Sequence, residues 1–192
     1  MSAARARAKG ARDAAPDAGG LSERLVRCRA LLAERRLDAI VVSDLADVRY
    51  LSGFRGEDAC LVVGRETALI VTDSRYVEQV REEVAGFELV EHESADLLAD
   101  TAAVVDLRLG AGLALGFQAG AVTHAGYLSL RRVHSGRLQD VGRRVSRLRA
   151  IKEAAEVEAI STAAAIVDLS LAVVVGEGLV GRSERDVAWR LL

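Results

Sequence analysis

Apolar and polar residues follow helical and strand periods in turn along most of the chain. Near the start, apolar residues recur at spacings of four, three and four, at Leu21, Leu25, Cys28 and Leu32. This period gives one apolar face and predicts a helix over residues 22–36. Short apolar runs of strand length follow, separated by polar or glycine-containing turns. They predict strands over 39–42, 59–63, 68–72, 87–90, 113–117 and 137–141.

Further helices are expected between these strands. Asp44 is a capping residue in front of a short helix that runs to about Leu51. Another helix is expected to begin at Asp73 or Ser74 and to end at Gly86, in the usual position of a C-terminal glycine. Longer helices are predicted over 95–109 and 123–133.

The turn at residues 64–67 joins two adjacent predicted strands as a hairpin. A hairpin adds antiparallel pairing to the parallel pairing that alternating strands and helices form. The sequence therefore predicts an α/β fold with a mixed sheet flanked by helices.

The pattern changes after Gly142, because residues 143–176 are almost continuously helical in character. A capping-box-like start at Ser183 then opens a last helix with one apolar face. That helix reaches Leu192 with no capping glycine and no polar end. We therefore expect a truncated chain, and the alternative is a short C-terminal helix docked on a partner.

The first twenty residues are built mainly from Ala, Arg, Gly and Asp, and they hold the only proline, Pro16. So little apolar surface cannot offset the entropy of ordering, which predicts a disordered tail over 1–20. The segment lacks the apolar centre of a secretory signal. An organelle transit peptide is the alternative, and the acidic residues Asp13 and Asp17 count against it.

Composition narrows the class of protein. Hydrophobic residues make up 51% of the chain and charged residues 28%, which indicates a globular protein. The net charge of −2 disfavours a globally basic nucleic-acid binder. Unbroken apolar runs reach only about five residues where a membrane span needs about 20, so no spanning segment is expected. Cys28 and Cys60 form no CxxC pair, which argues against a zinc or disulfide scaffold and favours the cytoplasm.

Two familiar catalytic patterns find little support. Gly110, Gly112 and Gly116 resemble a dinucleotide loop only in part, because the third glycine comes one residue too late for GxGxxG. They also precede a predicted strand, whereas a phosphate-binding loop follows one. They indicate a helix-to-strand turn. The chain has no GxSxG elbow, so a serine hydrolase is not supported.

The three histidines, His92, His124 and His134, show none of the spacings typical of metal ligands. Glu91 and Glu93 flank His92 but lie on the opposite face of its strand. A metal site from these residues would require a coincidence of tertiary structure. We expect surface or partly buried histidines instead.

Residues 131–152 carry eight Lys or Arg and a single acid, Asp140. Such a run could contact nucleic acid. Val141, Val145 and Leu148 nevertheless give it an apolar face, and it has no interleaved aromatic residues. The segment is interpreted as a solvated or interdomain helix, and no nucleic-acid partner is expected.

The strongest candidate chemistry lies in residues 47–56 and 72–79. Tyr50, Phe54 and Arg55 lie on or beside a glycine-flanked loop, which suits contact with a ligand or another subunit. In the second segment Asp73 can cap a helix with Arg75 near its start. The alternative is that the aromatic residues belong to the core and that Arg75 is a structural partner of an aspartate.

Several motifs occur in an order that resembles a known family. They are Arg-Leu-x-x-x-Arg-x-Leu-Leu at 24–32, Leu-Asp-Ala-Ile-Val-Val at 37–42, Val-Arg-Tyr-Leu-Ser-Gly-Phe-x-Gly at 48–56, Thr-Asp-Ser-Arg-Tyr-x-Glu-Gln at 72–79, Leu-Arg-Ala-Ile-Lys-Glu at 148–153 and Gly-x-Ser-Glu-x-Asp-Val-Ala at 181–188. Over residues 21–192 the chain resembles the creatinase-type pita-bread metallopeptidases, which are the Xaa-Pro aminopeptidases and prolidases. Asp47 departs from the asparagine that the family commonly has there.

The resemblance implies a creatinase-like N-terminal domain over 21–142. It implies a linker helix and the incomplete, helical start of the pita-bread catalytic domain over 143–192. The family's metal ligands, two Asp, one His and two Glu, lie downstream of the last motif. The resemblance therefore assigns this chain no catalytic residue and no metal ligand. Two divalent ions, Mn or Co, belong to the full-length family enzyme.

In the family the N-terminal domain shapes the active-site entrance, often that of a neighbouring subunit, and limits substrates to short peptides. The resemblance assigns this role to Tyr50, Phe54 and Arg55. It implies a homodimer and a short peptide substrate. The cysteine usage and the short apolar runs predict a cytoplasmic location with no membrane partner. The sequence does not distinguish an aminopeptidase, a dipeptidase and a creatine-type hydrolase.

Two hypotheses follow. In the first, the chain is the N-terminal portion of a metal-dependent Xaa-Pro peptidase and is inactive alone. In the second, it is a standalone, non-catalytic domain that dimerises or binds a partner.

Overall fold

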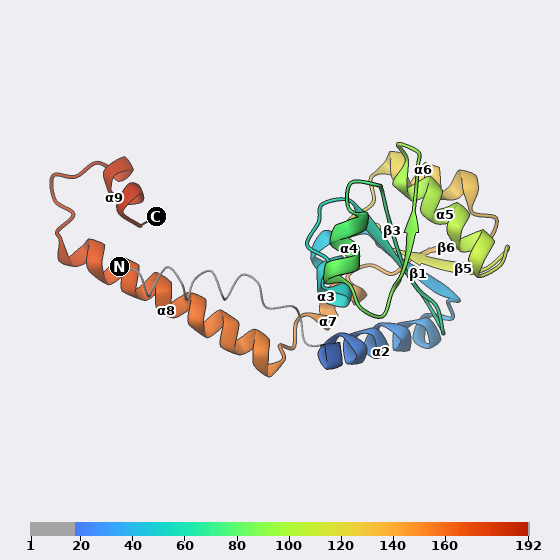
Figure 1. Ribbon diagram of the computed structural model, residues 1–192, viewed down its shortest axis with the longest axis horizontal. Coiled ribbons are helices and arrows are strands. Elements are labelled where there is room, and N and C mark those ends of the chain that lie inside the picture. Colours follow the sequence, from blue (N-terminus) through green and yellow to red (C-terminus); the bar gives the residue numbers. More distant parts are fainter. Residues whose placement is uncertain (1–17, 192) are drawn as a thin grey trace. The chain divides into compact units, whose positions relative to one another are not determined.

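A computed structural model describes residues 18–191 of the chain. The chain divides into two compact units, Met1–Ala150 and Ile151–Leu192, and each is described by itself (Figure 1). Most of the tail expected over 1–20 lies outside the described residues. Residues 18–20 form the first turn of a helix.

The first unit contains a six-stranded sheet with the order β4-β3-β2-β1-β5-β6. Strand β2 is antiparallel to β1 and β3, and the other neighbouring pairs are parallel. The predicted hairpin and the mixed sheet are therefore confirmed. The strands are β1 (Ala39–Val42), β2 (Ala59–Gly64), β3 (Ala68–Thr72), β4 (Glu88–Glu91), β5 (Ala114–Phe117) and β6 (Arg137–Asp140).

Alternating strand residues face two separate cores, because successive side chains of a strand point to opposite sides. Ile40 and Val42 of β1 pack with the helices α2 (Ala18–Arg35), α3 (Leu45–Ser52), α4 (Val77–Glu83) and α7 (Arg144–Leu148). Ala39 and Val41 pack on the other face, where α5 (Leu97–Arg108) contributes Val105. Helix α6 (His124–Val133) lies beside α5 and buries Leu130. Figure 1 shows α5 and α6 on one side of the sheet and α2 on the other.

The start of α3 follows its predicted cap, but two other helices begin elsewhere. Helix α2 begins at Ala18, before the predicted start at residue 22. The side chain of Asp44 accepts a hydrogen bond from the backbone N–H of Asp47, as expected of the residue that caps α3. Helix α4 begins later than predicted, at Val77. The N–H of Tyr76 donates to the carbonyl of Asp73 at 3.1 Å, so the residues after Asp73 form a separate turn.

The second unit contains α8 (Ala154–Gly176) and α9 (Glu184–Leu191). The nearly continuous helix expected over 143–176 is interrupted between α7 and α8, where Glu153 forms a capping box with Glu156. Glu153 has an extended backbone, as N-cap residues do, so the chain leaves the helical conformation before α8 begins.

Helix α8 is long and apolar enough to cross a membrane by length and composition, with a mean hydropathy of 2.0 over its most apolar window. Such a segment was not expected from the sequence because unbroken apolar runs are short in α8, where acidic, serine and threonine residues interrupt them. The large apolar side chains of α8, including Ile166, Leu169 and Val173, are exposed.

Candidate functional site

One edge of the sheet collects several buried or partly buried polar residues. Because β1, β3, β4, β5 and β6 run in the same direction, their carboxyl ends lie together, next to the start of antiparallel β2. In α/β sheets this is the edge at which ligands bind. The segments that leave it carry Asp44, Asp58, Asp73, His92 and Gln118.

The carboxylate of Asp47, which is fully buried on α3, is the centre of this edge. Its Oδ1 accepts a hydrogen bond from Arg149 Nε at 2.6 Å. Its Oδ2 accepts bonds from Ser146 Oγ at 2.7 Å and from Gln118 Nε2 at 2.6 Å. A buried carboxylate needs such partners, since an isolated buried charge is very costly. The network therefore ties α3 to β5 and α7.

Gln118 has a fixed orientation in this network. Its Oε1 accepts hydrogen bonds from the backbone N–H groups of Ser43 and Asp44, at 2.9 and 3.1 Å. Its Nε2 must then point at Asp47, because the amide has its oxygen on one side only. A cavity of about 330 Å³ lies beside this network, lined by Asp44, Gln118, Gly120, Ala121, Gly142, Arg143, Ser146 and Arg149.

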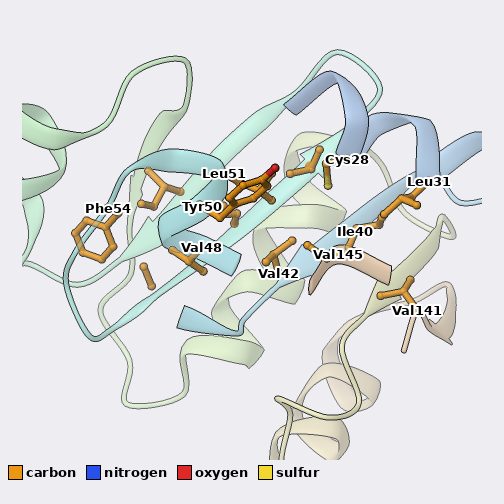
Figure 2. Close-up of a cluster of buried hydrophobic side chains, with 14 of the residues drawn as sticks. Cys28, Leu31, Ile40, Val42, Val48, Tyr50, Leu51, Phe54, Val141 and Val145 are labelled. Atoms are coloured by element: carbon orange, nitrogen blue, oxygen red, sulfur yellow. The ribbon is translucent and has the colours of Figure 1, made fainter. Parts of the chain in front are cut away.

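Tyr50 is buried and links three helices of the first unit (Figure 2). Its hydroxyl accepts a hydrogen bond from Arg27 Nη2 at 3.1 Å and donates one to the carbonyl of Leu148 at 3.2 Å. The guanidinium of Arg24 lies over its ring, with Cζ 4.4 Å from the centroid. The side chain therefore holds α2, α3 and α7 together.

Phe54 is also buried in this cluster (Figure 2). Its ring packs edge-on against Tyr76, with a centroid distance of 5.7 Å. Gly56 is required by this packing, because an added Cβ would lie 2.2 Å from Phe54 Cζ. The backbone N–H of Arg55 donates to Glu83 Oε2 at 2.8 Å, which fixes the loop to α4.

The predicted role of these three residues at an entrance or dimer contact stays a prediction. The structure separates them into two groups. Tyr50 and Phe54 have their side chains inside the domain, where they position the loop, and Arg55 is half-buried. A direct contact with a ligand or a second subunit would therefore fall to Arg55.

The segment 72–79 forms a second polar cluster at the same edge. Arg75 Nη2 lies 2.9 Å from Asp58 Oδ2 and 2.5 Å from Asp73 Oδ2. The hydrogen bond from Arg75 holds the pKa of Asp73 below its ordinary value. The alternative weighed for this arginine, a structural pairing with aspartate, is therefore what the structure shows.

The other candidates can be placed directly. Gly110 and Gly112 precede β5, in the helix-to-strand turn that was predicted. The basic residues of 131–152 are divided among α6, β6 and α7 and do not form one helix. Arg132 and Arg144 pair with Asp96 and Glu34.

Neither cysteine is suited to nucleophilic chemistry. Burial raises the pKa of Cys28 and Cys60 to about 12, and thiolates are the reactive form. Both are free thiols.

The Asp47 network was not predicted from the sequence. Its members lie far apart along the chain, and only the departure from asparagine at position 47 marked that residue as unusual. Arg149 supplies the positive charge that a carboxylate requires there.

Comparison with known proteins identifies the domain. Residues 24–151 match the Creatinase/Prolidase N-terminal domain. The chain belongs to this family. The resemblance predicted from the motifs is therefore confirmed.

A curated relative, the uncharacterized peptidase YqhT of Bacillus subtilis (strain 168), is 33% identical over 147 residues. The match covers 76% of this chain and 40% of that relative, so the chain spans less than half of the relative's length.

Solved structures show the same fold. The Xaa-Pro dipeptidase from Bacillus anthracis is 26% identical with a TM-score of 0.82, over 89% of this chain and 47% of that protein. The N-terminal domain of the cytoplasmic peptidase PepQ from Mycobacterium tuberculosis H37Rv is 28% identical with a TM-score of 0.60, over 66% of this chain and 98% of that structure. The first unit ends at residue 150 of 192, so a match over 89% of the chain extends into the second unit.

Proposed function

We propose that this chain is the N-terminal portion of a metal-dependent Xaa-Pro aminopeptidase or prolidase-like enzyme that hydrolyses short proline-containing peptides. The observation that carries the proposal is the match to an Xaa-Pro dipeptidase, which extends into the second unit of this chain but covers only 47% of that protein. The remaining half of such an enzyme would supply the side chains that bind two divalent metal ions, Mn or Co.

Helix α8 supports this assignment. Its large apolar side chains are exposed, which a stable soluble domain avoids over so large an area. The match to the dipeptidase reaches the second unit, so we assign α8 to the start of the catalytic domain and not to a membrane span. The rest of that domain would cover its apolar surface.

The chain by itself is proposed to be inactive. Among residues 18–191, the one group of three or more metal-ligand side chains within reach of each other is Asp58, Asp73 and His92. This group differs from the two Asp, one His and two Glu of the family. The cysteine thiols are protonated, so they offer no alternative nucleophile.

In the full enzyme, the first unit would shape the substrate entrance. The loop that carries Arg55 is fixed to α4 and to the aromatic pair of Phe54 and Tyr76, so it can present a charge at a defined position. We propose that this loop contributes to a homodimer in the cytoplasm and limits the substrate to short peptides.

A chimaera tests the proposal. Residues 24–151 of this chain would replace the matching domain of the Bacillus subtilis peptidase, and hydrolysis of Ala-Pro and Ala-Pro-Ala would be measured with Mn²⁺ and Co²⁺. We expect metal-dependent hydrolysis by the chimaera and none by the 192-residue chain. A folded, metal-loaded chimaera without activity, when the parent peptidase is active, would overturn the proposal.

The gene gives an independent check. We expect the reading frame beyond the codon for Leu192 to stay open and to supply two Asp, one His and two Glu. An immediate stop codon would favour the second candidate, a standalone domain that dimerises or binds a partner. The exposed apolar surface of α8 is the observation that favours it, since a partner could cover that surface.

A further inference from the structure

Three potential metal ligands come from neighbouring segments at the carboxyl edge of the sheet. Ala59 of β2 pairs with Thr72 of β3, so Asp58 and Asp73 lie next to each other, just outside the sheet. Thr72 also pairs with Glu91 of β4, so His92 follows in the same row. The carboxylates of Asp58 and Asp73 and a ring nitrogen of His92 all lie within 4.8 Å of one another.

The ring of His92 is held from one side and lacks a partner on the other. The residue is only 8% exposed. Its Nδ1 lies 3.2 Å from Asp100 Oδ2, and that oxygen also accepts a hydrogen bond from Ser94 Oγ at 2.6 Å. Its Nε2 is buried and has no hydrogen-bond partner. A buried polar atom without a partner destabilises a protein, so an unpaired ring nitrogen calls for an explanation.

A histidine bound to a metal has this arrangement. One ring nitrogen binds the ion, and the other donates its proton to a carboxylate, which fixes the tautomer and orients the ring. Asp100 is in the position of that carboxylate, so Nε2 is the nitrogen left for an ion. Two carboxylates and an imidazole form a ligand set suited to Zn²⁺ and related ions.

The two carboxylates are already arranged around a cation. The guanidinium of Arg75 contacts both Asp58 and Asp73, although its side chain is 65% exposed. An exposed arginine can turn away into water at little cost, and the same carboxylates would then be free for an ion. Asp58 also lines an open cavity of about 680 Å³, which would give water access to the ion.

We propose that Asp58, Asp73 and the Nε2 atom of His92 bind one divalent transition-metal ion, with Asp100 as the positioning residue. Zn²⁺ bonds of about 2.0–2.2 Å put tetrahedral ligand atoms roughly 3.4 Å apart. The three side chains therefore move slightly inward when the ion binds, and Arg75 leaves. This inference does not rest on the proposed function, because it concerns residues of the first unit alone.

The experiment uses the purified, untagged 192-residue chain, freed of metal by a chelator that is then removed. Zn²⁺ would be titrated by isothermal calorimetry, and the visible absorption of bound Co²⁺ would report the ligand geometry. We expect one ion per chain. His92→Gln is expected to weaken binding by at least about tenfold, and Asp100→Asn by about tenfold through loss of ring orientation. His124→Ala, which changes an exposed histidine, is the matched control and should bind like the parent.

Arg75→Ala tests the same site independently, in case the His92 variant does not fold. Removal of the competing guanidinium should strengthen binding several-fold while circular dichroism shows the parent fold and the buried thiols of Cys28 and Cys60 stay unreactive. Asp58→Asn, at a partly exposed position, should weaken binding while circular dichroism shows the parent fold. Equal binding by the parent and the His92, Asp58 and Arg75 variants would overturn the proposal. Absence of binding to the folded parent at millimolar Zn²⁺ would overturn it as well.

Discussion

Asp47 and Arg149 form an ion pair between residues 102 positions apart, with 2.6 Å between Oδ1 and Nε. The carboxylate is fully buried, and the arginine is 37% exposed. Arg149 immediately follows α7, so this pair fixes the last helix of the first unit to α3. The domain's C-terminal end is thereby held in place directly before the chain enters the second unit.

Loss of Arg149 should destabilise the domain. Removing one partner of a buried ion pair lowers the free energy of unfolding by about 3–5 kcal/mol. Because water can reach this arginine, we expect a smaller loss, about 2–3 kcal/mol, for Arg149→Met. Asp47→Asn should also destabilise, because its amide group would face donors from Gln118 or Arg149. Urea unfolding of both single variants and the double variant gives the coupling energy, expected to be about 1 kcal/mol or more. Arg131→Met, an exposed arginine on α6, is the control. A coupling energy near zero would contradict the prediction.

Gly136 should not tolerate any side chain. An added Cβ would lie 1.9 Å from the carbonyl oxygen of Leu113, and backbone cannot move aside like a flexible side chain. Gly136→Ala is expected to lower the free energy of unfolding by about 3 kcal/mol. Gly120→Ala is the matched control, since its Cβ would meet nothing within 4 Å, and it should change stability by less than about 0.5 kcal/mol. Similar unfolding midpoints for the two variants would contradict the predicted clash at Gly136.

Both cysteines should be protected in the native protein. Burial raises the pKa of Cys28 and Cys60 to about 12, so at pH 8 only about one thiol in ten thousand is ionised. We expect no reaction with Ellman's reagent over an hour in native buffer. Both thiols should react in 6 M urea within the mixing time. Rapid reaction of either cysteine without denaturant would show that its surroundings are open.

The stability of the first unit should fall in acid because of Asp106. Burial acts to raise the pKa of this carboxyl, but hydrogen bonds from the side chain and N–H of Ser135 and from His134 outweigh it and lower the pKa below 3.8. The unfolded chain thus takes up the proton first, so this stabilisation is present above about pH 4 and is lost as the pH falls further. Asp106→Asn should reduce the slope of unfolding free energy against pH below pH 4. An unchanged slope would exclude Asp106 as a contributor.

The apolar surface of α8 should make the chain associate. A variant that ends at Ala150 keeps the whole first unit, and the PepQ N-terminal domain of similar extent has been solved by itself. We expect this variant to elute as a single small species on size-exclusion chromatography, whereas the 192-residue chain elutes earlier and concentration-dependently. Identical, concentration-independent elution as monomers would contradict the prediction.

Local patterns predicted most of the fold. The short apolar run at 39–42 predicted a strand, the spacing from Leu21 predicted a helix, and Asp44 was recognised as a cap, because such patterns depend on neighbours within a few residues. The late start of α4 and the interruption before α8 were not predicted, since competing local hydrogen bonds decide helix ends. The motifs predicted the family from their order alone.

The sequence by itself determined the fold class, the family and the apolar faces of the helices. Only the tertiary structure decided which polar residues meet: Asp47 with Arg149, and His92 with Asp58 and Asp73. Strand order and register bring together residues that are distant in sequence, and no spacing rule encodes that order. The same tertiary structure buried Tyr50 and Phe54, because their burial depends on elements that are distant in the chain, such as α2 and α7 around Tyr50 and Tyr76 against Phe54.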